Sequence, residues 1–147
     1  MKTIIPPVLF ILCIITMIGI KYLTPEQTFL SPPFNYAGII LIVAGLFFTI
    51  QVRKSFDKLN TEIHTFKRPR KLVIDGLFNL SRNPIYLGFT IALIGVWLLT
   101  GNLLAIIGVL VFFLTTNFWY IPYEEKVMER EFGDQYLAYK SKVRRWI

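Results

Sequence analysis

The fold is decided by residues 84–121, which read PIYLGFTIALIGVWLLTGNLLAIIGVLVFFLTTNFWYI. This stretch contains no Asp, Glu, Lys, Arg or His, and it is interrupted only by the turn-forming residues Thr100-Gly101-Asn102. A connection this short joins two antiparallel helices. The stretch therefore predicts a hairpin of two apolar helices, over about 84–100 and 103–121.

Two further apolar runs, residues 4–20 and 36–52, also lack charged side chains. A bilayer core about 30 Å thick needs about 20 helical residues at about 1.5 Å rise each, a length these runs approach with their flanks. Lys2 before the first run is also typical of a signal peptide, but no small-x-small cleavage site follows. We expect one all-α integral membrane domain over 1–147, with four transmembrane helices at about 4–23, 36–52, 84–100 and 103–121.

Composition agrees with a membrane protein. Of the 147 residues 54% are hydrophobic and 17% are charged, whereas a soluble domain has about 25% charged residues. The single cysteine, Cys13, excludes an intrachain disulfide. No Cys/His spacing resembles a zinc site, so no metal is expected.

The charges divide unequally between the two sides of the predicted bundle. Lys21 and Glu26 lie on the side of the 22–35 loop, and the other fifteen of the sixteen basic residues lie on the opposite side. By the positive-inside rule, both termini and segments 53–83 and 122–147 are cytoplasmic. Because the basic residues flank spans as topology signals, the net charge of +7 does not indicate a nucleic-acid partner.

Small residues four apart, at Gly88 and Ala92 and at Gly101 and Ala105, are typical of closely packed membrane helices. Chance occurrence of glycine in an apolar run explains each pair equally well. On the cytosolic side, the second helix is expected to extend over residues 53–66. Its apolar face would consist of Phe56, Leu59, Ile63 and Phe66.

Helix boundaries follow from capping residues. Asn83 is expected to cap a helix with Pro84 at its first position, and Pro122 is expected to open a cytosolic helix. Gly133 should end that helix, with Asp134 capping a second one. Tyr136 and Tyr139 are interpreted as packing residues that share a face with Phe132, and Arg144, Arg145 and Trp146 as an interfacial anchor rather than a site. For Glu125, a charge favoured by the helix dipole and a role at the site are equally open.

Two stretches carry a resemblance to a known family. Residues 72–88, LVIDGLFNLSRNPIYLG, resemble the LVxxGxFxxxRxPxYxG signature of the isoprenylcysteine carboxyl methyltransferase family. Residues 124–143, EEKVMEREFGDQYLAYKSKV, are similar to that family's second signature, EExxLxxxFGxxYxxYxxxV. The resemblance covers about residues 53–147, and the two signatures are separated by a helical hairpin as in the family.

This resemblance implies an integral membrane methyltransferase that uses S-adenosylmethionine. It implies that the cytosolic loop and the C-terminal cytosolic helix form the cofactor pocket. A Rossmann-like methyltransferase would need strands and a glycine-rich βα turn, which the chain lacks. The cofactor contacts carried over from the family are Arg70, Lys71, Leu72, Val73, Phe78, Asn83, Pro84, Ile85, Tyr86 and Glu124.

Two departures from the family pattern bear on the site. Asn83 stands where eukaryotic members usually have His, so an amide or a backbone group must replace the imidazole. Tyr120 stands where those members have an Arg that meets the substrate carboxylate. With Asn117, Tyr120 marks the expected substrate-binding position. The methyl acceptor is therefore open to a thiol, an amine or a lipid head group reaching the site from the bilayer.

The side-chain chemistry suits these roles. A carboxylate such as Glu124 suits the cofactor's ammonium or a ribose hydroxyl, and Arg or Lys suits its carboxylate. Aromatic rings such as Phe78 and Tyr86 suit the adenine or the cation. No catalytic base is identified. Phospholipid N-methylation and a non-catalytic membrane module remain alternatives, and a nicotinamide-dependent reductase ranks last because no dinucleotide fingerprint is visible.

Overall fold

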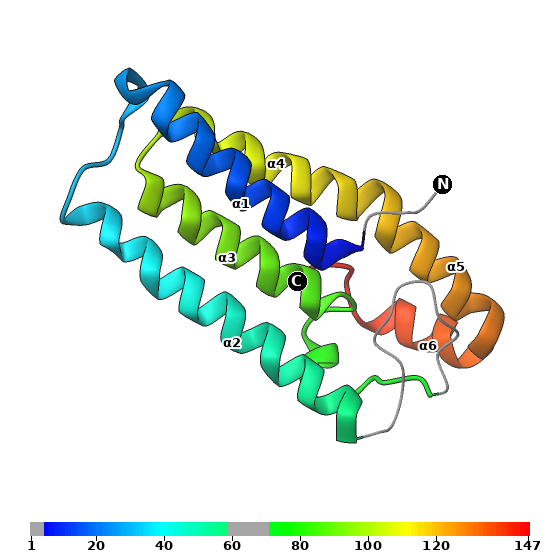
Figure 1. The fold of residues 1–147 in the computed structure, drawn as a ribbon. Coiled ribbons are helices and arrows are strands. Elements are labelled where there is room, and N and C mark those ends of the chain that lie inside the picture. The colour runs from blue at the N-terminus through cyan, green and yellow to red at the C-terminus, as the bar shows by residue number, and fades with distance from the viewer. Residues whose placement is uncertain (1–4, 59–70) are drawn as a thin grey trace.

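The computed structural model describes residues 5–58 and 71–147, and four apolar helices run alongside one another through most of it (Figure 1). The main helices are α1 (Pro6–Leu23), α2 (Ala37–Lys58), α3 (Pro84–Thr100), α4 (Ile106–Thr115), α5 (Ile121–Phe132) and α6 (Asp134–Lys142). Short helical turns are η1 (Pro25–Gln27), η2 (Phe34–Tyr36), η3 (Gly76–Asn79), η4 (Leu103–Ala105) and the π-helical η5 (Thr116–Tyr120). The described ranges contain no strand, only an isolated bridge between Thr28 and Asn102.

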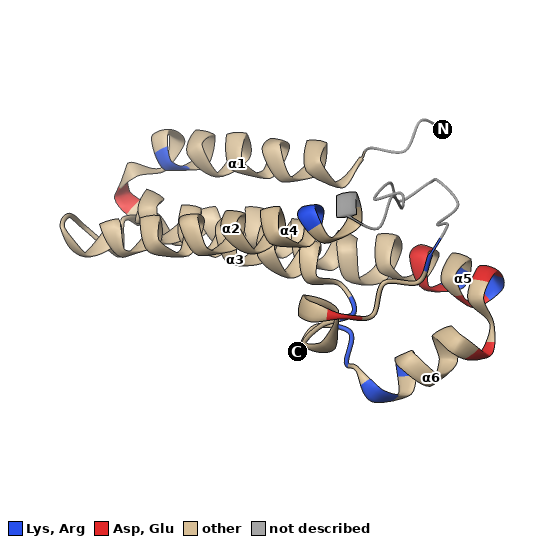
Figure 2. Cartoon of the chain, turned by 90° about the horizontal axis from the view of Figure 1, so that it is seen from below, with Lys and Arg blue, Asp and Glu red and all other residues tan. Residues whose placement is uncertain are grey.

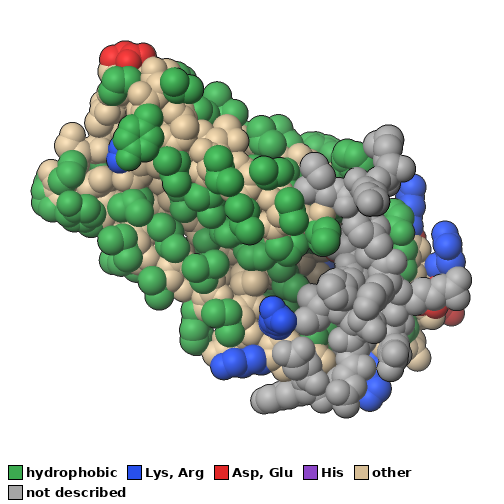
Figure 3. All heavy atoms as spheres, viewed as in Figure 1, with side chains coloured by type: hydrophobic (Ala, Val, Ile, Leu, Met, Phe, Trp, Pro, Cys, Tyr) green, Lys and Arg blue, Asp and Glu red, His purple; other side chains and the backbone are tan. Residues whose placement is uncertain are grey.

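Three helical segments are long and apolar enough to cross a membrane: Pro6–Leu23, Phe34–Phe56 and Leu103–Phe132. The fourth expected span, Pro84–Thr100, is an apolar helix of 17 residues. Its bounds agree with the sequence prediction. Large apolar side chains point outward, for example Ile40 with 71% of its surface exposed, and they cover much of the bundle surface (Figure 3). Such a surface suits contact with lipid tails rather than water.

Helices α2 and α3 pack through glycines. A Cβ atom at Gly95 would lie 2.5 Å from the carbonyl oxygen of Gly38, and one at Gly88 would lie 2.8 Å from that of Gly45. The predicted packing role of Gly88 is thus confirmed. Gly101 serves another purpose, because its φ of 64° forms the left-handed turn that ends α3.

Asn102 closes the end of the bundle away from α5 and α6. Its Nδ2 donates to the carbonyl of Thr24 at 2.7 Å, and its own carbonyl accepts from Trp97 Nε1 at 3.1 Å. Beside it, Asn35 Nδ2 donates to the carbonyl of Leu99 at 3.0 Å. These hydrogen bonds connect the 24–35 loop to the α3–α4 turn. The 24–35 loop and the α3–α4 turn are therefore fixed relative to each other.

Pro122 lies in the first turn of α5, as expected, but α5 does not begin after a loop. The chain is helical from α4 through η5 into α5 without a break. Proline cannot donate to the carbonyl four residues earlier and its ring crowds that carbonyl. The wider π-helical turn immediately before Pro122 accommodates both effects. One continuous helix therefore carries the apolar span directly into the charged residues Glu124 and Glu125.

The C-terminal helices form a second core against α2. It is built from Val52, Val73, Phe78, Tyr136 and Tyr139, with Phe132 packed beside it. This confirms the face predicted for Phe132, Tyr136 and Tyr139. The expected capping by Asp134 is off by one residue. Gly133 is the cap, because a φ of 49° at this turn favours glycine, and Asp134 is the first residue of α6.

The expected extension of the second helix beyond residue 52 is seen as far as Lys58. Its residue Phe56 packs edge-on against Phe78, with ring centroids 5.5 Å apart. Leu59, Ile63 and Phe66 lie outside the described residues. Charged side chains gather at the end of the bundle where α5 and α6 lie, whereas the opposite end carries Lys21 in α1 and Glu26 in η1 (Figure 2).

Candidate functional site

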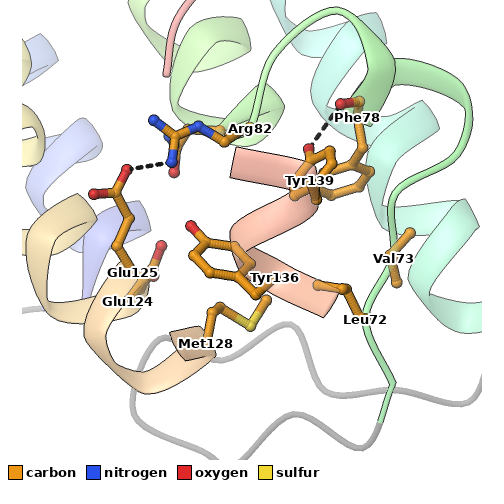
Figure 4. Close-up of a pocket in the computed structure, with 10 residues that line it drawn as sticks. Leu72, Val73, Phe78, Arg82, Glu124, Glu125, Met128, Tyr136 and Tyr139 are labelled. Carbon is orange, nitrogen blue, oxygen red and sulfur yellow. Dashed lines mark hydrogen bonds and ion pairs between the residues drawn. The ribbon is translucent and has the colours of Figure 1, made fainter. Parts of the chain in front are cut away.

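A pocket lies where α5, α6 and the segment before α3 meet (Figure 4). Its volume is about 50 Å³. The side chains that line it are Leu72, Val73, Phe78, Arg82, Asn83, Glu124, Glu125, Met128, Tyr136 and Tyr139. The first five come from the 72–88 stretch and the rest from the 124–143 stretch. Two sequence motifs separated by the α3–α4 hairpin thus form a single pocket.

Glu125 is the centre of an ion-pair network in the pocket wall. Its side chain is nearly buried, and its two oxygens accept from Arg145 Nε at 3.2 Å and Arg145 Nη2 at 2.9 Å. Arg82 Nη1 lies 3.0 Å from Oε1, and Lys140 Nζ lies 3.8 Å from Oε2. A buried carboxylate needs such compensation. The interpretation of Glu125 as a helix-dipole charge, one of the two that the sequence left open, did not indicate these contacts.

Arg82 presents unused hydrogen-bond donors. Its side chain is 10% exposed, and among the residues that the structure describes its Nε and Nη1 atoms have no hydrogen-bond partner. The contact of Nη1 with Glu125 is an ion pair whose geometry does not satisfy that donor. Buried donors usually find an acceptor, so this guanidinium is suited to an anionic ligand group.

Two tyrosines of α6 face the same pocket. The hydroxyl of Tyr139 donates to the carbonyl of Phe78 at 2.7 Å (Figure 4). Burial raises the pKa of Tyr139 well above its usual range, and neighbouring Tyr136 adds to the rise. Burial also raises the pKa of Tyr136, with Glu125 adding to the effect and Arg82 opposing it. Both phenols are therefore neutral at physiological pH.

A second polar contact lies at the edge of the pocket, between α3 and α5. The hydroxyl of Tyr86 donates to Glu124 Oε1 at 2.8 Å. The ring of Tyr86 stacks on that of Tyr120, with centroids 6.4 Å apart and planes at 19°. Tyr86 thus links the pocket carboxylate to Tyr120 in η5.

Residues 144–146 contact groups beside the pocket, which their interpretation as an interfacial anchor did not indicate. The carbonyl of Arg144 accepts from Arg82 N at 3.0 Å, and that of Arg145 accepts from Asn83 Nδ2 at 3.0 Å. Trp146 Nε1 donates to Asn117 Oδ1 at 3.0 Å. This segment therefore connects the loop before α3, α5 and η5. These contacts with protein groups could not be inferred from residue type alone.

The structure brings together most of the residues expected to contact the cofactor. Leu72, Val73, Phe78, Asn83 and Glu124 line the pocket. Pro84 and Tyr86 are buried in the first turn of α3, and Ile85 is partly buried against the second core. The side chain of Lys71 is exposed and does not line the pocket. Arg70 lies outside the described residues.

The residues expected to bind the substrate lie on η5. Tyr120 is buried and Asn117 is partly buried, and neither lines the pocket itself. Both are connected to it, Tyr120 through Tyr86 and Asn117 through Trp146.

Sequence reasoning left Arg82, with Arg70 and Lys71, as a candidate for touching a ligand. It did not assign five other residues that line or support the pocket: Glu125, Met128, Tyr136, Tyr139 and Arg145. Four of these five lie within the second motif, so their position in a motif was an available signal. Arg145 lies outside both motifs, and nothing in the sequence indicated its contact with Glu125.

The sequence of this chain is similar to those of membrane methyltransferases. The family model described as phospholipid methyltransferase matches residues 34–135. Protein-S-isoprenylcysteine O-methyltransferases B and A of Arabidopsis thaliana are each 32% identical, over 103 and 113 residues. These matches cover 70% and 72% of this chain but only 47% and 55% of the plant proteins, so the chain spans about half their length.

An uncharacterized protein of Haemophilus influenzae is 44% identical over 63 residues, which is 43% of this chain and all of that protein. No solved structure matches. The family match extends across α2, α3, α4 and α5, together with the described part of the loop before α3, and it includes most of the pocket-lining residues. With its apolar helices, this membrane protein belongs to the phospholipid methyltransferase family.

Proposed function

We propose that the protein is an integral membrane methyltransferase, which moves a methyl group from S-adenosylmethionine to a small or lipid-like nucleophile at the cytosolic membrane face. The observation that carries this proposal is the meeting of the 72–88 and 124–143 stretches around one pocket. Family membership supports the reaction class. The relatives named as isoprenylcysteine O-methyltransferases support it as well.

The pocket chemistry fits the cofactor. S-adenosylmethionine supplies a methyl group on a sulfonium, next to an ammonium, a carboxylate and an adenine ring. Glu124 offers a carboxylate for the ammonium, and Leu72, Val73, Phe78 and Met128 offer an apolar surface for the adenosine part. The proposed cofactor residues are Arg70, Lys71, Leu72, Val73, Phe78, Asn83, Pro84, Ile85, Tyr86 and Glu124.

The size of the pocket adds a condition. A volume of about 50 Å³ is well below the roughly 300–1,000 Å³ of pockets for drug-sized ligands. We propose that the pocket walls separate when the cofactor binds. The partly exposed ion pair Lys140–Glu129 can break during such a movement.

We place the methyl acceptor beside η5, at Asn117 and Tyr120. The neighbouring Phe118 and Trp119 are 72% and 54% exposed, and they present apolar rings where the apolar span meets the charged end. This supports approach from the bilayer. The residues of η5, TNFWY, include no cation, which favours an acceptor other than a carboxylate. Orientation of the two reactants with exclusion of water supplies up to about 7–11 kcal/mol in such reactions.

The proposed topology has several membrane passes, with both termini and the pocket in the cytoplasm. It is supported by the charge distribution, because most charges gather at the α5 and α6 end (Figure 2). Cysteine can be placed at Glu26 or at Lys142 in a Cys13→Ser background. A membrane-impermeant maleimide should label only the Glu26→Cys variant in intact cells. Labelling of only the Lys142→Cys variant would show that the orientation is opposite to the one proposed.

Cofactor use is tested by isothermal titration of the purified full chain with S-adenosylhomocysteine. We expect saturable binding, and no heat at millimolar ligand would contradict the proposal. Membranes with and without the protein, supplied with methyl-deuterated S-adenosylmethionine, should then differ in labelled products detected by mass spectrometry.

Phospholipid N-methylation is the second candidate, because the matching family model is described as phospholipid methyltransferase. It predicts mono- or dimethylated ethanolamine lipids after overexpression, and their absence would remove this candidate. A non-catalytic role predicts that Glu124→Ala leaves S-adenosylhomocysteine binding unchanged. A marked loss of affinity in that variant would argue against a purely structural module.

A further inference from the structure

Arg82 is the pocket residue best suited to hold an anion. Its guanidinium lines the pocket and is nine-tenths buried, and Nε and Nη1 find no hydrogen-bond acceptor among the described residues. Leaving such donors unsatisfied is unfavourable in a protein interior. A planar guanidinium binds a carboxylate or phosphate well because two N–H groups can donate together.

Glu125 fixes where that guanidinium lies. It contacts Arg82 on one side and the fork of Arg145 on the other, with Arg145 Nε and Nη2 at 3.2 and 2.9 Å. The two-bonded contact with Arg145 restricts rotation of the carboxylate. Main-chain contacts add to the restriction, since the carbonyls of Arg144 and Arg145 hold the loop that carries Arg82.

The opposite charge is present in the same pocket. Glu124 lines it, with its Oε1 accepting from the hydroxyl of Tyr86. A pocket that offers both a guanidinium and a carboxylate matches a ligand that carries an anion and an ammonium together. The amino-acid end of S-adenosylmethionine has this pair of charges. Lys71, which the sequence suggested for the anion, is exposed and does not line the pocket.

We propose that Arg82 binds the carboxylate at the amino-acid end of the cofactor, and that Arg145 is a positioning residue that holds Arg82 in place through Glu125. This inference rests on the proposed function, because it concerns the same pocket. It adds two residues, one that touches the ligand and one that acts through another side chain.

The test compares two ligands by titration calorimetry: S-adenosylhomocysteine and S-adenosyl-3-thiopropylamine, which lacks only the carboxylate. The wild-type chain should bind the first about tenfold or more tightly than the second, the usual effect of a charged hydrogen bond. Arg145→Gln should lower the affinity for S-adenosylhomocysteine by about tenfold and change the affinity for S-adenosyl-3-thiopropylamine by less than about twofold. Arg130→Gln, at an exposed arginine of α5, is the matched control and should change neither.

Two further variants separate positioning from general stability. Arg82→Gln should remove the preference for the carboxylate-bearing ligand. If Arg145 acts through Glu125, the double variant Glu125→Gln/Arg145→Gln should bind S-adenosylhomocysteine no more weakly than Glu125→Gln alone. Thermal unfolding of each variant reports whether the fold is retained. If Arg82→Gln fails to fold, the Arg145→Gln comparison still decides the proposal.

Different results would contradict the proposed cofactor binding and the proposed roles of Arg82 and Arg145. Wild-type protein that binds neither ligand overturns the proposed function. Wild-type protein that binds both ligands equally keeps the cofactor but overturns the role of Arg82. Equal weakening of both ligands by Arg145→Gln, or an unchanged affinity for both, overturns the positioning role of Arg145.

Discussion

The hydroxyl of Tyr86 donates a 2.8 Å hydrogen bond to Glu124, which joins the first turn of α3 to the first turn of α5. The two residues are 38 positions apart in sequence. Tyr86 thereby fixes one oxygen of the carboxylate that lines the pocket. The other oxygen is the one we expect to meet the cofactor's ammonium.

Replacing Glu124 by Gln removes the charge while keeping a hydrogen-bond acceptor for Tyr86. We expect about 10- to 100-fold weaker binding of S-adenosylhomocysteine, the range for a lost charged hydrogen bond. S-adenosyl-3-thiopropylamine should weaken equally, because it keeps the ammonium. Titration calorimetry measures both. Glu26→Gln, at an exposed carboxylate in η1, is the control, and unchanged affinities in Glu124→Gln would contradict the assignment.

Replacing Tyr86 by Phe should lower the affinity for S-adenosylhomocysteine by about fivefold. The variant loses the hydrogen bond that positions Glu124, and such a bond contributes about 1 kcal/mol. The ring remains available to stack on Tyr120. The same titration measures the effect. A loss as large as that of Glu124→Gln would show that Tyr86 contacts the ligand more directly than we infer.

Replacing Gly88 by Ala should destabilise the bundle by about 1–3 kcal/mol, the usual cost of overpacking. The new Cβ atom would lie 2.8 Å from the carbonyl of Gly45, so α2 and α3 must separate. Gly19→Ala in α1 is the matched control because a Cβ there meets nothing within 4 Å. Unfolding in detergent should separate the two variants, and equal stabilities would show that close contact of α2 with α3 does not matter.

Replacing Tyr139 by Phe should cost about 1–3 kcal/mol at pH 8, because the carbonyl of Phe78 loses its donor. The wild-type protein should also lose stability above about pH 10. In the unfolded chain the Tyr139 phenol ionises near pH 10, whereas folding raises its pKa. The stabilisation that comes from the neutral phenol is therefore complete below about pH 10 and falls as the pH rises above it. Unfolding at pH 8 and pH 11 should show a smaller alkaline loss in the variant, with Tyr22→Phe, at an exposed tyrosine, as control.

Replacing Asn102 by Ala should cost about 2–4 kcal/mol, since a helix cap and buried partners are lost together. Its side-chain oxygen caps η4 at Leu104 N, and its Nδ2 bonds Thr24. Ligand affinity should not change, because Asn102 lies at the opposite end from the pocket. Unfolding and titration measure the two effects, and Asn79→Ala, at an exposed position, is the stability control.

The elements that sequence predicts best are those with local causes. Pro84 begins α3 and Gly101 ends it, because the backbone requirements of these residues do not depend on distant partners. Asn83 lies at the N-cap position as expected, but its side chain makes no capping hydrogen bond and donates to the carbonyl of Arg145 instead. The charge-free runs identify the apolar helices for the same reason. The helical course through Pro122 was not predictable in this way. It depends on the π-helical turn at residues 116–120, which no residue spacing in the sequence indicates.

The pocket was partly predictable. Leu72, Val73, Phe78, Asn83 and Glu124 follow from the two motifs, and the structure gathers them. The contact of Arg145 with Glu125 joins residues 20 apart through a turn and a helix, and no periodicity indicates it. Trp146 illustrates the same limit. An indole suits a membrane interface as well as a buried hydrogen bond, and only the fold selects its bond with Asn117.

The two ends of the bundle are fastened by different forces. Around Asn102 the connections are short hydrogen bonds between amide groups and carbonyls, which dissolved ions hardly weaken. Around Glu125 ion pairs are added, of which Arg82–Glu125 is buried and Arg145–Glu125 reaches solvent through Arg145. Raising the ionic strength should therefore weaken the Arg145–Glu125 contact more than any contact at the Asn102 end. The end around Asn102 is thus held by hydrogen bonds, whereas the end around Glu125 is also held by ion pairs.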